Sequence, residues 1–177
     1  MAGFAGVAFD FRRQGGKRIL SEFWRERKKA KMDAGTYISY VNHFKKFYDL
    51  SFKEKAKEYN LQMIDIHILL FVKNNPTLNT ARDVVYSRSL SKSNVSNALE
   101  KLRKRNLVRL EEDSGNRRIQ RIFLEPEGEA VALELKKVQA LCFKRMLKGF
   151  SEEERKILNQ SIGRIDENVM AALKELG

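Results

Sequence analysis

Hydrophobic residues recur at helical spacings over much of the chain. In residues 35–59 apolar side chains return every three or four positions and form one stripe, which predicts a single long helix. Residues 61–72 predict a second helix, which the Asn-Asn-Pro run at residues 74–76 ends, because proline disfavours a helical residue before it. The chain has only 2 Pro and 10 Gly in 177 residues, and this favours long helices over a turn-rich β fold.

Two shorter helices are predicted next, each with its own capping residue. Thr80 is expected to cap a helix over residues 81–88, and Ser91 a helix over residues 92–105. A side-chain oxygen at this position accepts a hydrogen bond from a backbone N–H that has no partner within the helix. Asn106 suits the left-handed conformation that often ends a helix.

The period then changes from helical to extended. Residues 107–110 and 117–124 predict two strands, and the Asp-Ser-Gly-Asn run at residues 113–116 predicts the turn between them. A hairpin directly after two short helices is typical of a winged helix-turn-helix.

Two further helices are predicted in the C-terminal third. Pro126 suits the first position of a helix that extends to about residue 148, and Gly149 ends it. The Ser-Glu-Glu-Glu run at residues 151–154 is a capping box that opens the last helix. Apolar residues in that helix are spaced four and three apart, the seam of a coiled coil, which favours pairing of two subunits over packing within one. The seam consists of Leu158, Ile162, Ile165, Val169, Ala172 and Leu176.

These elements predict a mainly α protein with a small β-hairpin wing. Its expected parts are a basic N-terminal arm, partly flexible or helical, and a first dimerisation helix, followed by the DNA-binding winged helix-turn-helix and the C-terminal dimerisation helices. The corresponding residues are 1–34, 35–60, 61–124 and 125–177.

The charge is concentrated around the predicted winged helix. The chain carries a formal net charge of +12, and residues 88–121 hold ten Lys or Arg against four Asp or Glu. Such a field favours polyanions such as DNA or RNA. Cys142 is the only cysteine, which excludes an intrachain disulfide and fits a reducing compartment. With no apolar run of about 18 residues and no secretory signal, we expect a cytoplasmic protein without membrane contact.

Enzymatic function is not expected. The sequence offers no nucleophile–base pair, no paired carboxylates and no phosphate-binding loop. His43, His67 and Cys142 do not form a cluster with metal-ligand spacing, so neither a metal nor another cofactor is predicted. We expect the thiol of Cys142 to be buried and inert, because it lies in an apolar stretch of a predicted helix.

Short polar and basic side chains gather where the predicted fold would meet DNA. They occupy the start of the second short helix and the hairpin, where Asn and Lys can read base edges and Arg can enter a minor groove or hold phosphates. The candidate DNA-binding residues are Ser91, Lys92, Ser93, Asn94, Ser96, Asn97, Lys101, Arg117, Arg118 and Arg121.

These motifs together resemble the MarR (multiple antibiotic resistance regulator) family of winged-helix repressors. Residues 90–96 are similar to the start of the family's recognition helix, and residues 113–118 to its wing signature. The resemblance extends over residues 35–176. Asn116 replaces the usual aspartate that pairs with the wing arginine, here Arg118, and Glu125-Pro126 replaces a threonine-led cap.

The resemblance implies a homodimeric repressor on a pseudo-palindromic DNA operator, released when a small aromatic or anionic effector binds. The candidate effector residues form an aromatic stripe with two histidines, and their alternative role is ordinary core packing. They are Tyr37, Tyr40, His43, Phe44, Phe47, His67 and Phe71. Two other functions remain open, a winged helix used for protein–protein assembly or RNA binding and an activator in place of a repressor.

Overall fold

A computed structural model of the chain describes residues 33–176. The arm predicted over residues 1–34 therefore lies outside the described residues except for Asp33 and Ala34. Of the described residues, 33–45 belong to one compact unit and 46–176 to another. Helix α2 (Ala34–Ser51) begins in the first unit, where the Asp33 carboxylate accepts a hydrogen bond from Thr36 N at 2.7 Å, and ends in the second.

The predicted single helix over residues 35–59 is two helices. α2 ends at Ser51 and α3 spans Lys53–Glu58. The Ser51 hydroxyl donates to the Phe47 carbonyl at 2.8 Å, and such bonds to the preceding turn bend helices. The next residue, Phe52, is completely buried, and its N–H bonds the carbonyl three residues back instead of four. The apolar spacing continues through this break, so periodicity alone could not detect it.

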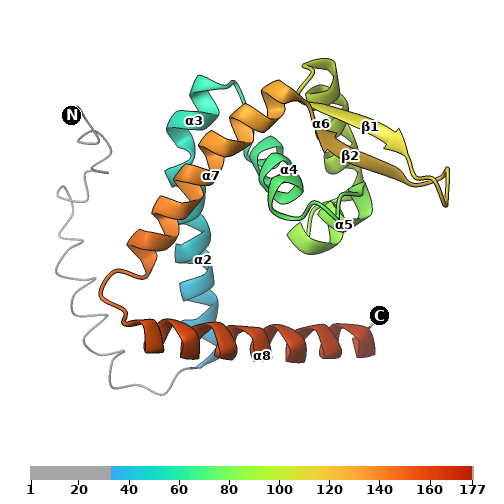
Figure 1. Ribbon diagram of the computed structural model, residues 1–177. Coiled ribbons are helices and arrows are strands. Elements are labelled where there is room, and N and C mark those ends of the chain that lie inside the picture. Colours follow the sequence, from blue (N-terminus) through green and yellow to red (C-terminus); the bar gives the residue numbers. More distant parts are fainter. Residues whose placement is uncertain (1–32, 177) are drawn as a thin grey trace. The chain divides into compact units, whose positions relative to one another are not determined.

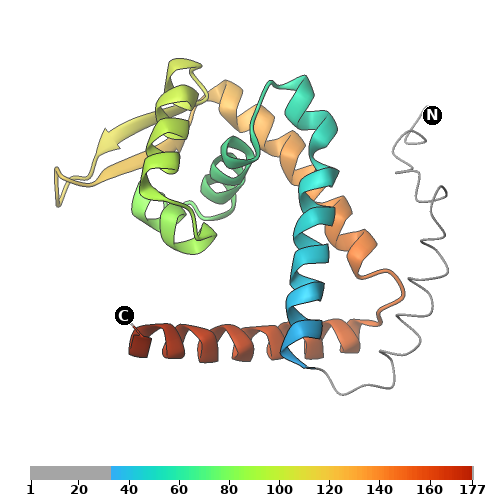
Figure 2. The same cartoon turned by 180° about the vertical axis from the view of Figure 1, so that it is seen from behind.

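The second unit has its hydrophobic core between four helices and a hairpin (Figures 1 and 2). The four helices around this core are α4 (Met63–Asn74), α5 (Ala81–Arg88), α6 (Lys92–Lys104) and α7 (Pro126–Met146). The predicted inward positions of α6 are confirmed, since Val95, Leu99 and Leu102 are all buried. They belong to the same hydrophobic cluster as core residues of the other elements, including Ile66, Leu70, Ile122 and Leu135.

The hairpin consists of β1 (Val108–Glu112) and β2 (Gln120–Leu124), paired antiparallel from Val108↔Leu124 to Glu112↔Gln120. β2 begins three residues later than predicted, because the turn is longer than the sequence indicated. Asp113 N donates to Ile119 O at 2.9 Å, and Ile119 N donates to Asn116 O at 2.8 Å. Residues 113–119 are therefore a closed turn that projects from the helices (Figure 1).

Two close contacts fix the hairpin to the helices at its base. Ile122 N donates to Asn79 O at 2.7 Å, and Thr80 forms an isolated β-bridge with Arg121, so the segment before α5 lies against β2. Gly128, in the first turn of α7, lies directly against Leu107, where a Cβ would meet the Leu107 carbonyl oxygen at 1.8 Å. Only glycine permits this approach of the two backbones.

The last helix, α8 (Glu152–Leu176), begins at the predicted capping box. Glu154 N donates to Ser151 Oγ at 3.2 Å, and Ser151 N donates to the Glu154 carboxylate at 2.7 Å. Gly149 ends the preceding segment with φ of +86°. Within residues 33–176 we find no helix long and apolar enough to cross a membrane.

Candidate nucleic-acid interface

One face of α6 is polar and exposed at its N-terminal end. Val95, Ala98, Leu99 and Leu102 point into the core. The residues before and between these core positions face outward. They include six of the ten predicted DNA-binding residues: Ser91, Lys92, Ser93, Asn94, Ser96 and Asn97. An amphipathic helix whose solvent face is made of short polar side chains and one lysine can enter a major groove and form hydrogen bonds there.

Ser91 has a structural role at this face in addition to any contact with DNA. Its hydroxyl accepts the hydrogen bond from Asn94 N at 3.2 Å and lies 3.3 Å from the hydroxyl of Ser93. The predicted cap of the helix is therefore confirmed. Since Ser91 and Ser93 are both exposed, the first turn of α6 presents hydroxyl groups to solvent.

Lys101 is engaged with the protein itself. Its Nζ lies 2.8 Å from Oδ2 of Asp65, a carboxylate of α4 that is completely buried. The same oxygen accepts the N–H of Gln62 at 2.8 Å, so Asp65 caps α4 and pairs with α6. A buried carboxylate requires such a partner. Lys101 thus joins α6 to α4, and its ammonium group would have to leave Asp65 or be shared with it to contact DNA.

The turn of the wing carries two exposed arginines. Arg117 and Arg118 are both exposed at residues 113–119. Asn116, which stands where the resembled family has an aspartate, accepts the backbone N–H of Arg118 through its Oδ1 at 3.1 Å. The wing tip is therefore a compact turn with two guanidinium groups directed to solvent, a chemistry suited to phosphates or a narrow minor groove.

The third predicted wing arginine, Arg121, lies in β2 and not at the tip. Its Nη1 donates to Asn79 Oδ1 at 2.9 Å, and its Nε donates to Asp113 Oδ2. The Arg121 guanidinium, followed by the N–H of Gly115, holds the pKa of Asp113 below its usual range. Arg121 was expected to bind DNA, but the structure gives its guanidinium two partners within the protein.

The predicted effector residues are distributed between exposed and buried positions. Tyr37, Tyr40, His43 and Phe44 are exposed in the first unit. In the second unit Phe71 is only 4 % exposed and belongs to the core, so the alternative of core packing holds for this residue. A hollow of about 330 Å³ lies against the wing, and its walls include Val72, Lys73 and Phe123 but none of the seven candidates.

A half-buried tyrosine lies close to one of these candidates, His67. The Tyr48 ring is 6.2 Å from that of His67, and its hydroxyl accepts a hydrogen bond from Gln139 Nε2 at 2.8 Å. Burial raises the pKa of Tyr48. Cys142 of α7 is buried, as predicted for an inert thiol.

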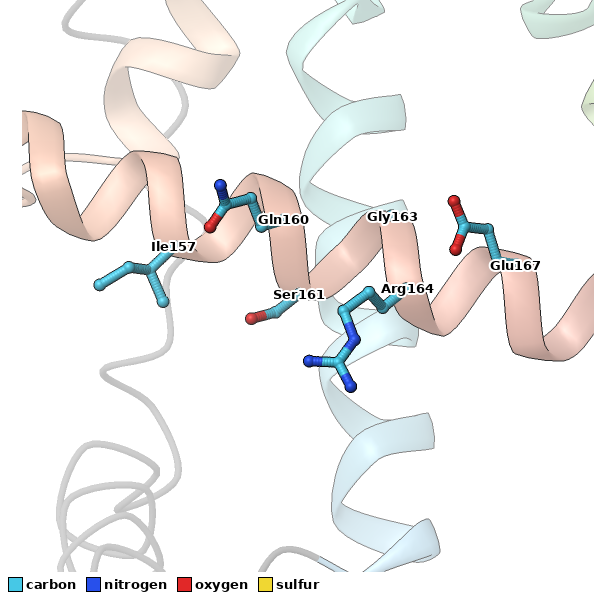
Figure 3. A pocket seen from close by; sticks show the side chains of 6 residues that line it. All are labelled: Ile157, Gln160, Ser161, Gly163, Arg164 and Glu167. Carbon is cyan, nitrogen blue, oxygen red and sulfur yellow. The ribbon is translucent and has the colours of Figure 1, made fainter.

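The predicted seam on α8 is exposed in the single chain. α8 buries none of its side chains, and Ile162, Ile165 and Val169 are 53, 38 and 49 % exposed. An open hollow beside this seam is lined by residues of α8 alone (Figure 3), and its lining includes no residue of another described element. Its lining residues are Ile157, Gln160, Ser161, Gly163, Arg164 and Glu167.

The sequence analysis missed two residues that position the interface, Asn79 and Asp65. Both are polar and buried, with 3 and 0 % exposure. Asp65 could have been found, since an acid three residues after Gln62 at a helix start is a capping signal. Asn79 carries no such signal, because its partners Arg121 and Ile122 lie more than 40 positions away.

Comparison with known proteins agrees with this architecture. Residues 59–119 match the model of a family described as "MarR family". The search of curated proteins found no match. A MarR protein from Peptoclostridium difficile has a similar structure, with a TM-score of 0.70 and 16% identity over 84% of this chain and 96% of that one.

Two further similar structures are of proteins for which a DNA complex or a small-molecule regulator is described. A putative MarR family transcriptional regulator from Listeria monocytogenes, solved in complex with 26mer DNA, has a TM-score of 0.67 and 20% identity, covering 78% of this chain and 90% of that one. Bordetella bronchiseptica BpsR, whose DNA binding is regulated by 6-hydroxynicotinic acid, has a TM-score of 0.58 and 17% identity, covering 72% and 96%. The likeness to the MarR family is thus confirmed: residues 59–119 match its model, and the fold is that of MarR-family transcriptional regulators.

Proposed function

We propose that this protein is a homodimeric transcriptional regulator that binds a specific double-stranded DNA sequence. The observation that carries the proposal is the joint exposure of the polar N-terminal face of α6 and of two arginines at the wing tip. The first can read base edges in a major groove, and the second can hold phosphates or enter the adjoining minor groove. The Listeria protein of the same fold was solved with DNA, which supports this assignment.

Homodimerisation is part of the same proposal. The exposed apolar seam of α8 has the spacing of a coiled coil and extends from Leu158 to Leu176. A dimer would place two copies of α6 about one helical turn of DNA apart, so the operator would be a pseudo-palindrome.

Repression and release by an effector extend the proposal. BpsR supports a small aromatic anion as the class of effector, because 6-hydroxynicotinic acid regulates its DNA binding. Of the candidates in this chain, His67 lies beside the Tyr48 ring, whose hydroxyl accepts a hydrogen bond from Gln139. Titration of hydroxylated aromatic carboxylates against the protein–DNA complex tests this extension, and continued DNA binding at saturating ligand would refute it.

Selection of bound duplexes from a random DNA pool at about 0.15 M salt tests the proposed function. We expect a palindrome whose half-sites are roughly 10 base pairs apart, centre to centre. Recovery of no consensus, with binding that disappears as salt rises, would contradict sequence-specific regulation and favour RNA binding or protein–protein assembly.

Two alanine variants then test the docking. On the selected duplex, Arg118→Ala should weaken binding by about 1–3 kcal/mol if the guanidinium reaches a groove. Lys92→Ala should reduce the slope of log affinity against log salt by about one if the ammonium meets a phosphate. Unchanged affinity and slope in both variants would exclude this mode of docking.

A further inference from the structure

A chain of hydrogen bonds connects the segment that precedes α5 with the turn of the wing. Arg121 lies at its centre, with Nη1 donating to Asn79 Oδ1 at 2.9 Å and Nε donating to Asp113 Oδ2. Asn79 precedes α5 and is 3 % exposed, whereas Asp113 opens the wing turn. We call Asn79, Arg121 and Asp113 the wing clamp.

Each end of the wing clamp is fixed independently of Arg121. Asn79 Nδ2 donates to the Ile122 carbonyl at 3.1 Å, and the Asn79 carbonyl accepts the Ile122 N–H at 2.7 Å. Asp113 Oδ1 accepts the N–H groups of Gly115 at 2.9 Å and Asn116 at 3.1 Å. The guanidinium therefore joins a buried anchor to the backbone that directly precedes the tip arginines.

The wing needs such a connection for physical reasons. A two-stranded hairpin is at best marginally stable by itself in water. Charge-assisted bonds to a carboxylate are stronger than neutral ones, and the planar guanidinium can bind two groups in a fixed geometry. With 40 % side-chain exposure for Arg121 and 15 % for Asp113, the ion pair is partly shielded from solvent.

We infer that Arg121 is a positioning residue that acts through the wing clamp and holds Arg117 and Arg118 in a fixed place for DNA. In this role its guanidinium does not contact DNA. The inference rests on the proposed function, because the arrangement of the tip has a consequence only where the tip meets a duplex.

The direction in which one substitution changes the DNA affinity separates this role from direct DNA contact. Asp113→Asn removes a negative charge from the wing and keeps an acceptor for the turn. If Arg121 touched DNA, loss of the competing carboxylate would tighten binding. A positioning role predicts weaker binding, by about fivefold, because the charge-assisted bond to Arg121 is lost. Glu112→Gln is the matched control, since it removes the same charge one residue earlier and outside the clamp, and it should not weaken binding.

A second variant tests whether Arg121 acts through Arg118. Arg121→Met removes the guanidinium and should weaken binding to the selected duplex by about tenfold. The cost of Arg118→Ala should also shrink in the Arg121→Met background, because the tip is then no longer held in place. If Arg121→Met only disturbed the core, the loss of DNA affinity caused by Arg118→Ala would be the same in both backgrounds.

Opposite results would overturn the inference. These are tighter or unchanged binding by Asp113→Asn, or an Arg118→Ala cost in affinity that is the same with and without Arg121→Met. If the full chain selects no duplex, the proposed function fails by itself, and amide hydrogen exchange of residues 115–118 then tests the clamp. Faster exchange in Asp113→Asn than in Glu112→Gln supports the clamp, and equal rates refute it.

Discussion

At the scale of residues, one glycine and one carboxylate have roles that the surrounding atoms define. Gly128 allows the first turn of α7 to lie on the Leu107 carbonyl, and Asp113 organises the wing turn through both of its oxygens. Each of these roles predicts a measurement.

Gly128→Ala should destabilise the protein strongly. Its Cβ would fall 1.8 Å from the Leu107 carbonyl oxygen, which is backbone and cannot rotate away. We expect a loss of about 3 kcal/mol in the free energy of unfolding, measured with urea, at the upper end of the usual cost of overpacking. The control is Gly115→Ala, whose Cβ would make an ordinary 3.4 Å contact and should cost less than about 1 kcal/mol. Equal stability of the two variants would contradict the close approach.

The low pKa of Asp113 predicts how acid affects the wing. The Arg121 guanidinium favours the ionised carboxylate, so the folded protein binds a proton there less readily than the unfolded chain. The stabilisation that ionised Asp113 gives the folded protein is complete above the pKa of this carboxyl in the unfolded chain. It is lost as pH falls through the lower pKa that Asp113 has in the folded protein. A carboxyl NMR titration should show the pKa of Asp113 rising in Arg121→Met. The pKa of Glu154, which Ser151 lowers, should not move.

At the scale of elements, the helix boundaries show what local sequence can and cannot specify. The caps at Thr80 and Ser91 and the left-handed Asn106 occur as predicted, because each depends on a residue and its nearest neighbours. The division of the first long helix at Phe52 was not predicted, since it depends on burial of that ring.

The candidate site follows the same distinction. The exposed polar face of α6 follows from the helical period, so Asn94 and Asn97 could be placed from sequence. The inward engagement of Lys101 with Asp65 and of Arg121 with Asn79 could not, because these pairs lie 36 and 42 positions apart. A count of positive charges near a helix-turn-helix cannot tell a lysine or arginine that faces DNA from one that joins two elements.

Ser91 allows the capping of α6 to be separated from DNA contact. Ser91→Ala should lower the free energy of unfolding by about 1 kcal/mol, whereas Ser91→Gly should cost only a few tenths, because glycine is an acceptable cap. If the hydroxyl also meets DNA, both variants lose affinity for the selected duplex to the same extent. If affinity follows stability instead, so that glycine binds like the wild type, Ser91 is a cap alone.

At the scale of the whole molecule, the exposed seam of α8 predicts the oligomeric state. Ile165 is central in the seam and is 38 % exposed in the single chain. Ile165→Lys would place a charge in an apolar subunit interface and should convert the dimer to a monomer in sedimentation velocity. Gln160→Lys adds the same charge outside the seam and should remain dimeric. A dimeric Ile165→Lys protein would show that the subunits pair elsewhere, and a monomeric wild type would refute dimerisation.

The proposed dimer also predicts a higher affinity for a palindrome than for a single half-site. A dimer presents two recognition helices at once, so the second half-site is bound at a high effective concentration. Ile165→Lys should therefore bind the selected palindrome far more weakly than the wild type, yet a single half-site about equally well. A fluorescence anisotropy titration with both duplexes distinguishes this loss of avidity from damage to α6.

The contact at Leu107 has a consequence for how such proteins diversify. Its carbonyl accepts the N–H of Glu125 at 3.1 Å and abuts Gly128, so the chain leaves for the hairpin and returns from it at one point. Within residues 108–124, Val108 and Ile122 belong to the hydrophobic core, whereas residues 114–119 of the tip are exposed. Changes in length or sequence at this tip should therefore leave the packing of α6 and α7 intact. Under the proposed function, the reach of the wing along DNA could then be engineered separately from α6.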